Sequence, residues 1–190
     1  MTRQLVAATK ALLVLTLVCG VGYPGAVLLV AQLVPGRAAG QPVLVDGREV
    51  GSHLLGQPAG GPGWFQGRPS ASDASGELSG GSNLGPSNPD LAAVVADRAA
   101  SLRAANPDAA AAIPPDALTA SASGLDPDIS PAYALWQVPR IAKVRGLDES
   151  AVRRIVAAHV EDAPLGMLGQ PRVNVLALNV ALDARTAGEE

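Results

Sequence analysis

The chain has 190 residues, a formal net charge of -3 and 48% hydrophobic residues, of which few are aromatic. Its 14 Lys and Arg residues are scattered, so no basic stripe with interleaved aromatic side chains is present to follow a phosphate backbone, and we expect no nucleic-acid partner. The single cysteine, Cys19, excludes a disulfide framework and a cysteine-based zinc site.

The first feature along the chain is an apolar segment over residues 11–34, which contains no charged side chain. At about 1.5 Å per residue, a helix of this length slightly exceeds the roughly 30 Å hydrocarbon core of a membrane. A cleavable signal peptide is the alternative, but its apolar part usually has about 7–15 residues. The sequence therefore predicts a transmembrane helix over 11–34, between a short segment 1–10 and a domain over 40–190.

The charges around this helix predict its orientation. Arg3 and Lys10 precede it without an acidic neighbour, whereas the arginines that follow it share their stretch with Asp46 and Glu49. Because positive charge close to a span is retained on the cytoplasmic side, residues 1–10 should be cytoplasmic and the domain extracytoplasmic.

The middle of the span contains Gly22, Tyr23 and Pro24. Pro24 removes a backbone hydrogen bond and glycine exposes the backbone, which packing against other membrane helices tolerates. The alternative is the ordinary richness of membrane helices in Gly and Pro. We expect these three residues to form a kinked face that docks against other membrane helices.

After the span, two strand-like runs over residues 43–50 flank Asp46-Gly47, a pair that suits a type I′ hairpin turn. Residues 56–87 are rich in Gly, Ser, Pro and Asn, which predicts an ordered or flexible loop, and the Trp64-Phe65 pair favours partial order. The 21 Gly, the 16 Pro and the scarcity of aromatic residues predict long loops and a small core. We expect such a domain to depend on a partner protein.

Two helices begin with clear start signals. Asn88 followed by Pro89 predicts a helix that runs to Asn106, and Ser130-Pro131 predicts another that stops at Gly146. Pro139 should kink or divide the second helix, since it lacks the N–H and its ring clashes with the preceding turn.

The C-terminal part contains a further helix and an ambiguous segment. Asp148 can cap a helix whose apolar residues recur at helical spacing, whereas residues 172–176 read either as a strand or, with Asn174 as the cap, as a helix through Leu182. The predicted fold class is α+β: one N-terminal transmembrane helix, then a single mixed domain with a small hairpin or sheet and several helices.

The sequence contains no complete catalytic motif. Neither Lys10 nor Lys143 lies in a GxxxxGK[ST] loop, no G-x-S-x-G elbow is present, and His53 and His159 lack a paired ligand spacing. We therefore expect a chain that is not itself an enzyme and holds no metal and no tightly bound cofactor.

One candidate binding segment is Ser79-Gly80-Gly81-Ser82-Asn83. Its glycines permit turns that aim consecutive N–H groups at an anion, and its hydroxyls and amide add donors. Together with Leu78 it also resembles, in miniature, the LSGG signature that transporter ATPases place against a nucleotide γ-phosphate. The alternative is a Gly/Ser turn without a ligand.

A second candidate is the hydroxyl-rich run over residues 119–128, which ends in Asp126 and Asp128. Oxygen ligands of this kind suit a hard cation, but the run lacks the glycine and the distal glutamate of an EF-hand. Local preferences favour a turn followed by a helix start.

Several groups of residues together form a family pattern. In chain order they are Gly22-Tyr23-Pro24; Gly51-Ser52 with Leu55-Gly56-Gln57; Phe65 with Arg68-Pro69-Ser70-Ala71; Ser79 to Leu84 with Ser87-Asn88-Pro89; Thr119-Ala120-Ser121 through Asp126; and Gly169-Gln170-Pro171 through Asn174-Val175 with Leu178-Asn179. With this pattern, nearly the whole chain resembles the C subunit of the Kdp-type bacterial potassium-transporting ATPase.

The resemblance implies a single-pass subunit of the bacterial inner membrane, in contact with lipid. Its implied partners are a channel-like, potassium-selecting subunit and a P-type ATPase subunit that hydrolyses ATP, and a small additional membrane subunit can join them. The family is described as a catalytic chaperone that raises the ATP affinity of the hydrolysing subunit through a transient complex containing ATP. Residues 79–83 would then contact the nucleotide.

The predicted orientation favours another function, because it places the domain outside the cell, where ATP is scarce. The chain would then be an extracytoplasmic structural subunit that shapes potassium access without touching nucleotide. Asp126 and Asp128 could raise the local cation concentration, over about a Debye length of 8 Å. A nucleotide-binding regulator facing the cytoplasm and a secreted Gly/Ser-rich domain remain as further alternatives.

Overall fold

The computed structural model describes residues 1–187, which form two compact units. The first, Met1–Pro42, is called the anchor unit here, and the second, from Val43 onward, is called the domain. The anchor unit holds one helix, Thr2–Ala31, that is long and apolar enough to cross a membrane. None of the side chains in this helix is buried.

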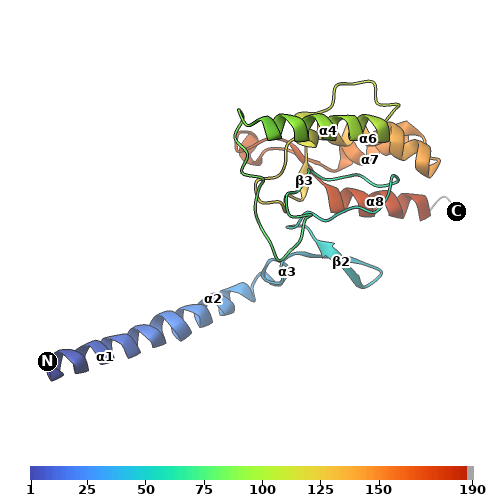
Figure 1. Ribbon diagram of the computed structural model, residues 1–190. Coiled ribbons are helices and arrows are strands. Elements are labelled where there is room, and N and C mark those ends of the chain that lie inside the picture. The colour runs from blue at the N-terminus through green and yellow to red at the C-terminus, as the bar shows by residue number, and fades with distance from the viewer. Residues whose placement is uncertain (188–190) are drawn as a thin grey trace. The chain divides into compact units, whose positions relative to one another are not determined.

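The long helix consists of α1 (Thr2–Leu17), a π-helical turn (Val18–Gly22) and α2 (Tyr23–Ala31), drawn in blue in Figure 1. It begins inside the segment expected to precede the span and ends before Val34, where α3 (Pro35–Ala38) follows a turn. The π turn lies directly before Pro24, and the Tyr23 N–H donates to the Val18 carbonyl. The backbone before Pro24 therefore forms a π turn.

The domain begins with the hairpin that the sequence predicts. Strands β1 (Pro42–Val45) and β2 (Arg48–Ser52) form a two-stranded sheet. The two turn residues both have positive φ, 50° at Asp46 and 75° at Gly47, as a type I′ turn requires. The predicted hairpin is confirmed.

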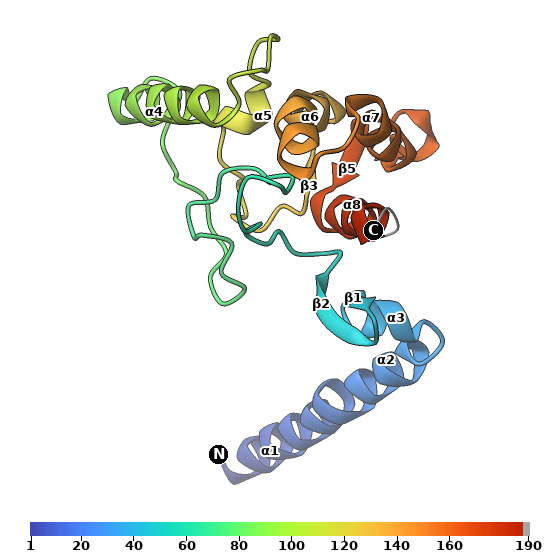
Figure 2. The same ribbon diagram turned by 90° about the vertical axis from the view of Figure 1, so that its right-hand side faces the viewer.

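The described part of the domain holds five α-helices, α4 (Pro89–Ala105), α5 (Pro115–Leu118), α6 (Pro131–Arg145), α7 (Glu149–Ala158) and α8 (Val175–Ala187), and a short 3-10 helix (Pro164–Gly166). Figure 2 shows α4, α5, α6 and α7 in a row, and α8 packs against α7. The predicted starts are confirmed, because Asn88 Oδ1 accepts from Asp90 N at 2.8 Å and Ser130 Oγ accepts from Tyr133 N at 3.0 Å. Gly146 ends α6 in the left-handed conformation, with φ 68°.

Of the two expected effects of Pro139, a kink or a division, the division does not occur, since α6 runs without interruption from Pro131 to Arg145. Pro139 removes one donor, which leaves the Leu135 carbonyl without its helical partner. The residues on both sides of it, Val138 and Arg140, are buried. Packing of the helix into the core therefore outweighs the local cost of the proline.

A three-stranded sheet was not predicted. Strands β3 (Asp128–Ile129), β5 (Arg172–Asn174) and β4 (Val160–Glu161) are antiparallel, with β5 in the centre. Residues 172–176 satisfy both interpretations, because the strand ends at Asn174 and α8 begins at Val175. Asn174 Oδ1 accepts from Ala177 N at 3.1 Å, as the predicted cap should.

The core lies between α6, α7, α8 and this sheet, which confirms the α+β fold class. Residues 53–88 form no helix or strand, but Phe65 within them is fully buried. Most core side chains are small or aliphatic: Phe65, Ala117, Ile129, Tyr133, Ala134, Trp136, Val138, Ile141, Ala142, Val152, Val156, Val173, Val175, Leu178 and Leu182.

Candidate functional site

The structure brings the two candidate segments of the sequence together. Residues 79–83 lie beside residues 121–124, since the Gly80 N–H donates to the Ser123 carbonyl at 2.8 Å and Ser79 Oγ donates to the same oxygen at 3.1 Å. These two donors of the glycine-serine segment are thus bound inside the domain. Ser82 and Asn83 are exposed.

Two glycines allow this close approach. A Cβ on Gly81 would lie 3.0 Å from the Ala122 carbonyl oxygen, and one on Gly124 would lie 2.8 Å from the Gly80 oxygen. Gly124 also has φ 71°, which favours glycine. A Cβ on Gly80 would instead meet open space. Close packing therefore explains why glycine stands at positions 81 and 124, but not why it stands at position 80.

The two candidate cation-attracting carboxylates are ion-paired. Asp126 Oδ2 lies 2.9 Å from Arg68 Nη1, and Asp128 Oδ2 lies 3.1 Å from Arg172 Nε. Burial raises the pKa of Asp128, although a hydrogen bond from Asn174 and the charge of Arg172 oppose this shift. A cation at either carboxylate would have to compete with an arginine.

Sequence reasoning missed a pair of buried amide side chains that hold the loop beside the core. Asn179 Oδ1 accepts from the Phe65 N–H at 2.9 Å, and Asn179 Nδ2 donates to the Phe65 carbonyl at 3.0 Å. Gln137 binds the N–H and the carbonyl of Gln66 in the same way, at 2.8 and 3.1 Å. Each amide therefore pairs with the backbone as a neighbouring strand would. The only signal in the sequence for this pairing is a polar residue at a core position of an apolar helix.

Arg140, only 8% exposed, extends this network. Its guanidinium donates to Asn106 Oδ1 at 2.7 Å, to Gln137 Oε1 at 2.8 Å and to the carbonyls of Pro62 and Trp64. Burial lowers the pKa of Arg140. All of these acceptors are uncharged, so the cation is stabilised by oriented dipoles from two separate loops and from Gln137 of its own helix.

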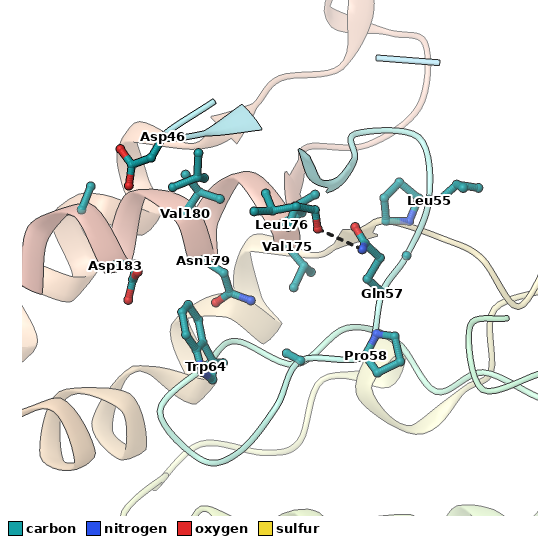
Figure 3. A pocket seen from close by; sticks show the side chains of 16 residues that line it. Asp46, Leu55, Gln57, Pro58, Trp64, Val175, Leu176, Asn179, Val180 and Asp183 are labelled. Atoms are coloured by element: carbon teal, nitrogen blue, oxygen red, sulfur yellow. Dashed lines mark hydrogen bonds between the residues drawn. The ribbon is translucent and has the colours of Figure 1, made fainter. Parts of the chain in front are cut away.

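One cavity of the domain is an apolar groove of about 500 Å³, between α8, the hairpin and residues 55–59. Figure 3 shows Leu176 and Val180 of α8 along it, with Trp64 on one side. Asp46 and Asp183 both lie at the end far from Leu55. The groove was not predicted, because its walls come from residues 45–64, Pro127 and α8, which are distant in sequence.

The groove follows from the composition of α8, which is apolar on two faces. Val175, Leu178 and Leu182 are buried in the core. Leu176 and Val180 are half-buried, lie four residues apart, and line the groove. This second apolar stripe is the signal in the sequence that could have revealed the groove.

The predicted docking face, Gly22, Tyr23 and Pro24, lies in the anchor unit at the junction of the π turn and α2. All three residues are exposed, and the Tyr23 side chain is 69% exposed. π turns inside helices occur frequently at functional sites.

Comparisons with known proteins identify relatives of the chain. The family model described as "K+-transporting ATPase, c chain" matches residues 5–184. A relative named "Potassium-transporting ATPase KdpC subunit" from Nitratidesulfovibrio vulgaris is 52% identical and aligns with 99% of this chain and 96% of its own. Relatives of the same name from Sorangium cellulosum and Geobacter sulfurreducens are 54% and 48% identical, over 96% and 95% of this chain and 98% and 97% of their own. With a family match over most of its length and relatives of this identity, the chain belongs to the family of the c chain of the K+-transporting ATPase.

Proposed function

We propose that the chain is an accessory, non-catalytic subunit of a high-affinity, ATP-driven potassium uptake pump in the bacterial inner membrane. The observation that carries this proposal is the apolar helix Thr2–Ala31, in which no residue is buried, joined to a folded domain. The proposal is supported by three candidate residues, because Ser79 is hydrogen-bonded and Asp126 and Asp128 are ion-paired within the domain. Its partners are a potassium-selecting subunit and a P-type ATPase subunit.

The exposed face of Gly22, Tyr23 and Pro24 is the proposed contact between the anchor helix and the membrane helices of these partners. The π turn before Pro24 contains two small, exposed residues, Gly20 and Gly22. Small residues let neighbouring backbones approach closely in a membrane, where packing rather than hydrophobicity drives association.

The finer proposal is that the subunit acts as a catalytic chaperone, which raises the ATP affinity of the P-type ATPase subunit through a transient complex containing nucleotide. Two observations support contact through residues 79–83. Ser82 and Asn83 are exposed, and Gly80 is a glycine without a packing reason. A phosphate that approached the Gly80 backbone would supply such a reason.

Two alanine substitutions test this proposal in the purified pump. Gly80→Ala is expected to raise the KM for ATP severalfold and to leave the thermal unfolding of the subunit unchanged, because its Cβ meets open space. Gly124→Ala is expected to lower the free energy of unfolding by more than about 1 kcal/mol, through strain at positive φ and the contact with the Gly80 carbonyl. The readouts are KM for ATP and thermal unfolding.

The outcome separates the proposals. One result is that the pump needs the subunit for its wild-type KM for ATP and yet keeps this KM with Gly80→Ala. That result would show that residues 79–83 do not bind nucleotide. A pump with the same ATPase activity and KM in the presence and absence of the subunit would remove the accessory function as well.

The second candidate is an extracytoplasmic structural subunit that shapes potassium access without nucleotide contact. It is favoured by the internal hydrogen bonds of Ser79 Oγ and the Gly80 N–H, which leave fewer donors for a phosphate. Attraction of cations by Asp126 and Asp128 is a weaker part of this candidate, because both carboxylates face an arginine.

Cysteine labelling in intact cells tests the side of the membrane. In a Cys19→Ser background, a cysteine introduced by Ala104→Cys on the exposed surface of α4 is expected to react with an impermeant maleimide. A cysteine introduced by Gln4→Cys, in the segment before the apolar span, serves as the control that stays unlabelled until the cells are opened. Protection of the α4 position would place the domain in the cytoplasm and favour the nucleotide contact.

A further inference from the structure

The groove along α8 combines an apolar floor with acidic groups at one end. Leu176 and Val180 form part of its floor, and Pro58 and Trp64 contribute further apolar surface. Its volume of about 500 Å³ lies in the range of ligand pockets, 300–1,000 Å³. Several lining residues at its edge are exposed, so the groove is open along its length.

The polar amides in the groove are already used within the domain. Gln57 Nε2 donates to the Val50 carbonyl at 3.3 Å, which Figure 3 shows as a dashed line, and both ends of the Asn179 amide hold Phe65. A ligand in the groove would therefore meet aliphatic surface and carboxylates rather than free amides.

Two carboxylates, those of Asp46 and Asp183, determine which ligand charge the groove favours. Among residues 1–187, Asp46 has no ion-pair partner, and its side chain is exposed at the hairpin turn. Asp183 lies 3.2 Å from Arg145 Nη1 but remains 61% exposed. The Arg145 guanidinium also lies 4.2 Å from the centre of the ring of Trp64, a residue that lines the groove, whereas Arg145 itself does not line it. This end of the groove thus has an excess of negative charge, which favours a cation.

Three kinds of molecule could occupy the groove: a phospholipid, a second copy of the chain and a segment of another protein. The charges at the end of the groove distinguish them. The phosphate of a phospholipid head group would be repelled by Asp46 and Asp183. A second copy of the chain could offer an exposed apolar loop, but this loop directly follows Glu161 and Asp162, which would bring like charges together. The loop's exposed side chains are Leu165, Met167 and Leu168. A protein segment with aliphatic residues beside Lys or Arg matches both the floor and the end of the groove.

We propose that this groove is the docking site for a segment of another subunit of the pump, in which a run of aliphatic residues lies next to a Lys or Arg that pairs with Asp46 and Asp183. The proposal rests on the proposed function as an accessory subunit. It also explains why α8 carries a second apolar stripe that the core leaves uncovered.

Photo-crosslinking in the assembled, purified pump tests the site. A photoreactive benzoyl-phenylalanine replaces Ala184, an exposed residue at the edge of the groove. The expected product joins this position to a segment of another pump subunit that contains aliphatic residues and a Lys or Arg, identified by mass spectrometry. The same probe at Ala93, exposed on α4, is the matched control and should not capture that segment.

Neutralising the carboxylates tests the charge. Asp46→Asn with Asp183→Asn should raise the Kd of the labelled subunit for the pump that lacks it by about two- to fivefold for each carboxylate, as exposed ion pairs do. Asn tolerates the positive φ at position 46, so the hairpin turn is kept. The difference from wild type should disappear at 1 M salt, where charges are screened within about 3 Å. Asp97→Asn, exposed on α4, is the control variant and should leave the Kd unchanged.

Each other outcome contradicts the proposal in a recognisable way. Capture of lipid alone, of a second copy alone, or of a segment without a basic residue would assign the groove to another occupant. If the subunit binds and supports the pump but Ala184 captures nothing, the groove proposal fails and the accessory function stands. If the subunit does not bind the pump at all, both fail.

Discussion

Replacing Arg140 by methionine is expected to lower the free energy of unfolding of the domain by about 3–5 kcal/mol. Methionine keeps most of the apolar stem, so the loss comes from the acceptors of the guanidinium. The side-chain oxygens of Asn106 and Gln137 and the carbonyl of Trp64 would lose a charged donor inside the domain. A buried acceptor left without its donor costs about 1–3 kcal/mol.

The measurement is urea unfolding of the full chain in detergent, followed by the fluorescence of its two tryptophans. Lys143→Met in the same helix is the matched control, because the Lys143 side chain is 71% exposed and its ion pair with Asp108 lies at the surface. We expect this control to change the free energy of unfolding by less than about 1 kcal/mol. Equal effects of the two substitutions would show that the Arg140 network does not stabilise the domain.

Removing the Phe65 side chain is the second large effect. Phe65→Ala should lower the free energy of unfolding by about 3–5 kcal/mol, since the ring is fully buried and its loss leaves a cavity. Phe65 is also the residue whose backbone Asn179 holds from both sides, so the loop should detach from α8 when the ring is lost. Because Trp64 lines the groove, the Kd for the pump should rise in the same variant.

The control for this prediction is Leu78→Ala, in the same irregular segment but with a 63% exposed side chain. It should change the free energy of unfolding by about 0.5 kcal/mol at most, as surface substitutions usually do. Hydrogen exchange of the Phe65 and Gln66 amides gives a second readout, because both N–H groups are protected by side-chain amides. Rapid exchange of these amides in the wild-type chain would contradict the proposed binding of this loop by the Asn179 and Gln137 side chains.

The features that depend on interactions between residues close in sequence were predictable. Helix starts were predictable, since Asn88, Ser130 and Asn174 bind backbone groups two or three residues away. The hairpin was predictable for the same reason, because the φ preferences of Asp46 and Gly47 are local. The apolar span was predictable from composition alone, although its helix extends to Thr2.

The three-stranded sheet was not predictable, because strands of two or three residues are too short to show an alternating pattern. The sequence left open whether Pro139 would kink or divide α6, because the local rule for proline ignores the burial of its neighbours. In both cases long-range packing decided the outcome.

The sequence by itself thus determined the apolar helix, the hairpin, the helix caps and the family, because each depends on neighbours in the chain or on composition. Only the tertiary structure decided how the glycine-serine segment lies beside residues 121–124, how Asn179 reaches Phe65 across 114 residues, and where the groove lies. The physical reason is that a buried polar side chain must find a partner wherever the fold provides one. Short-range patterns cannot specify that partner.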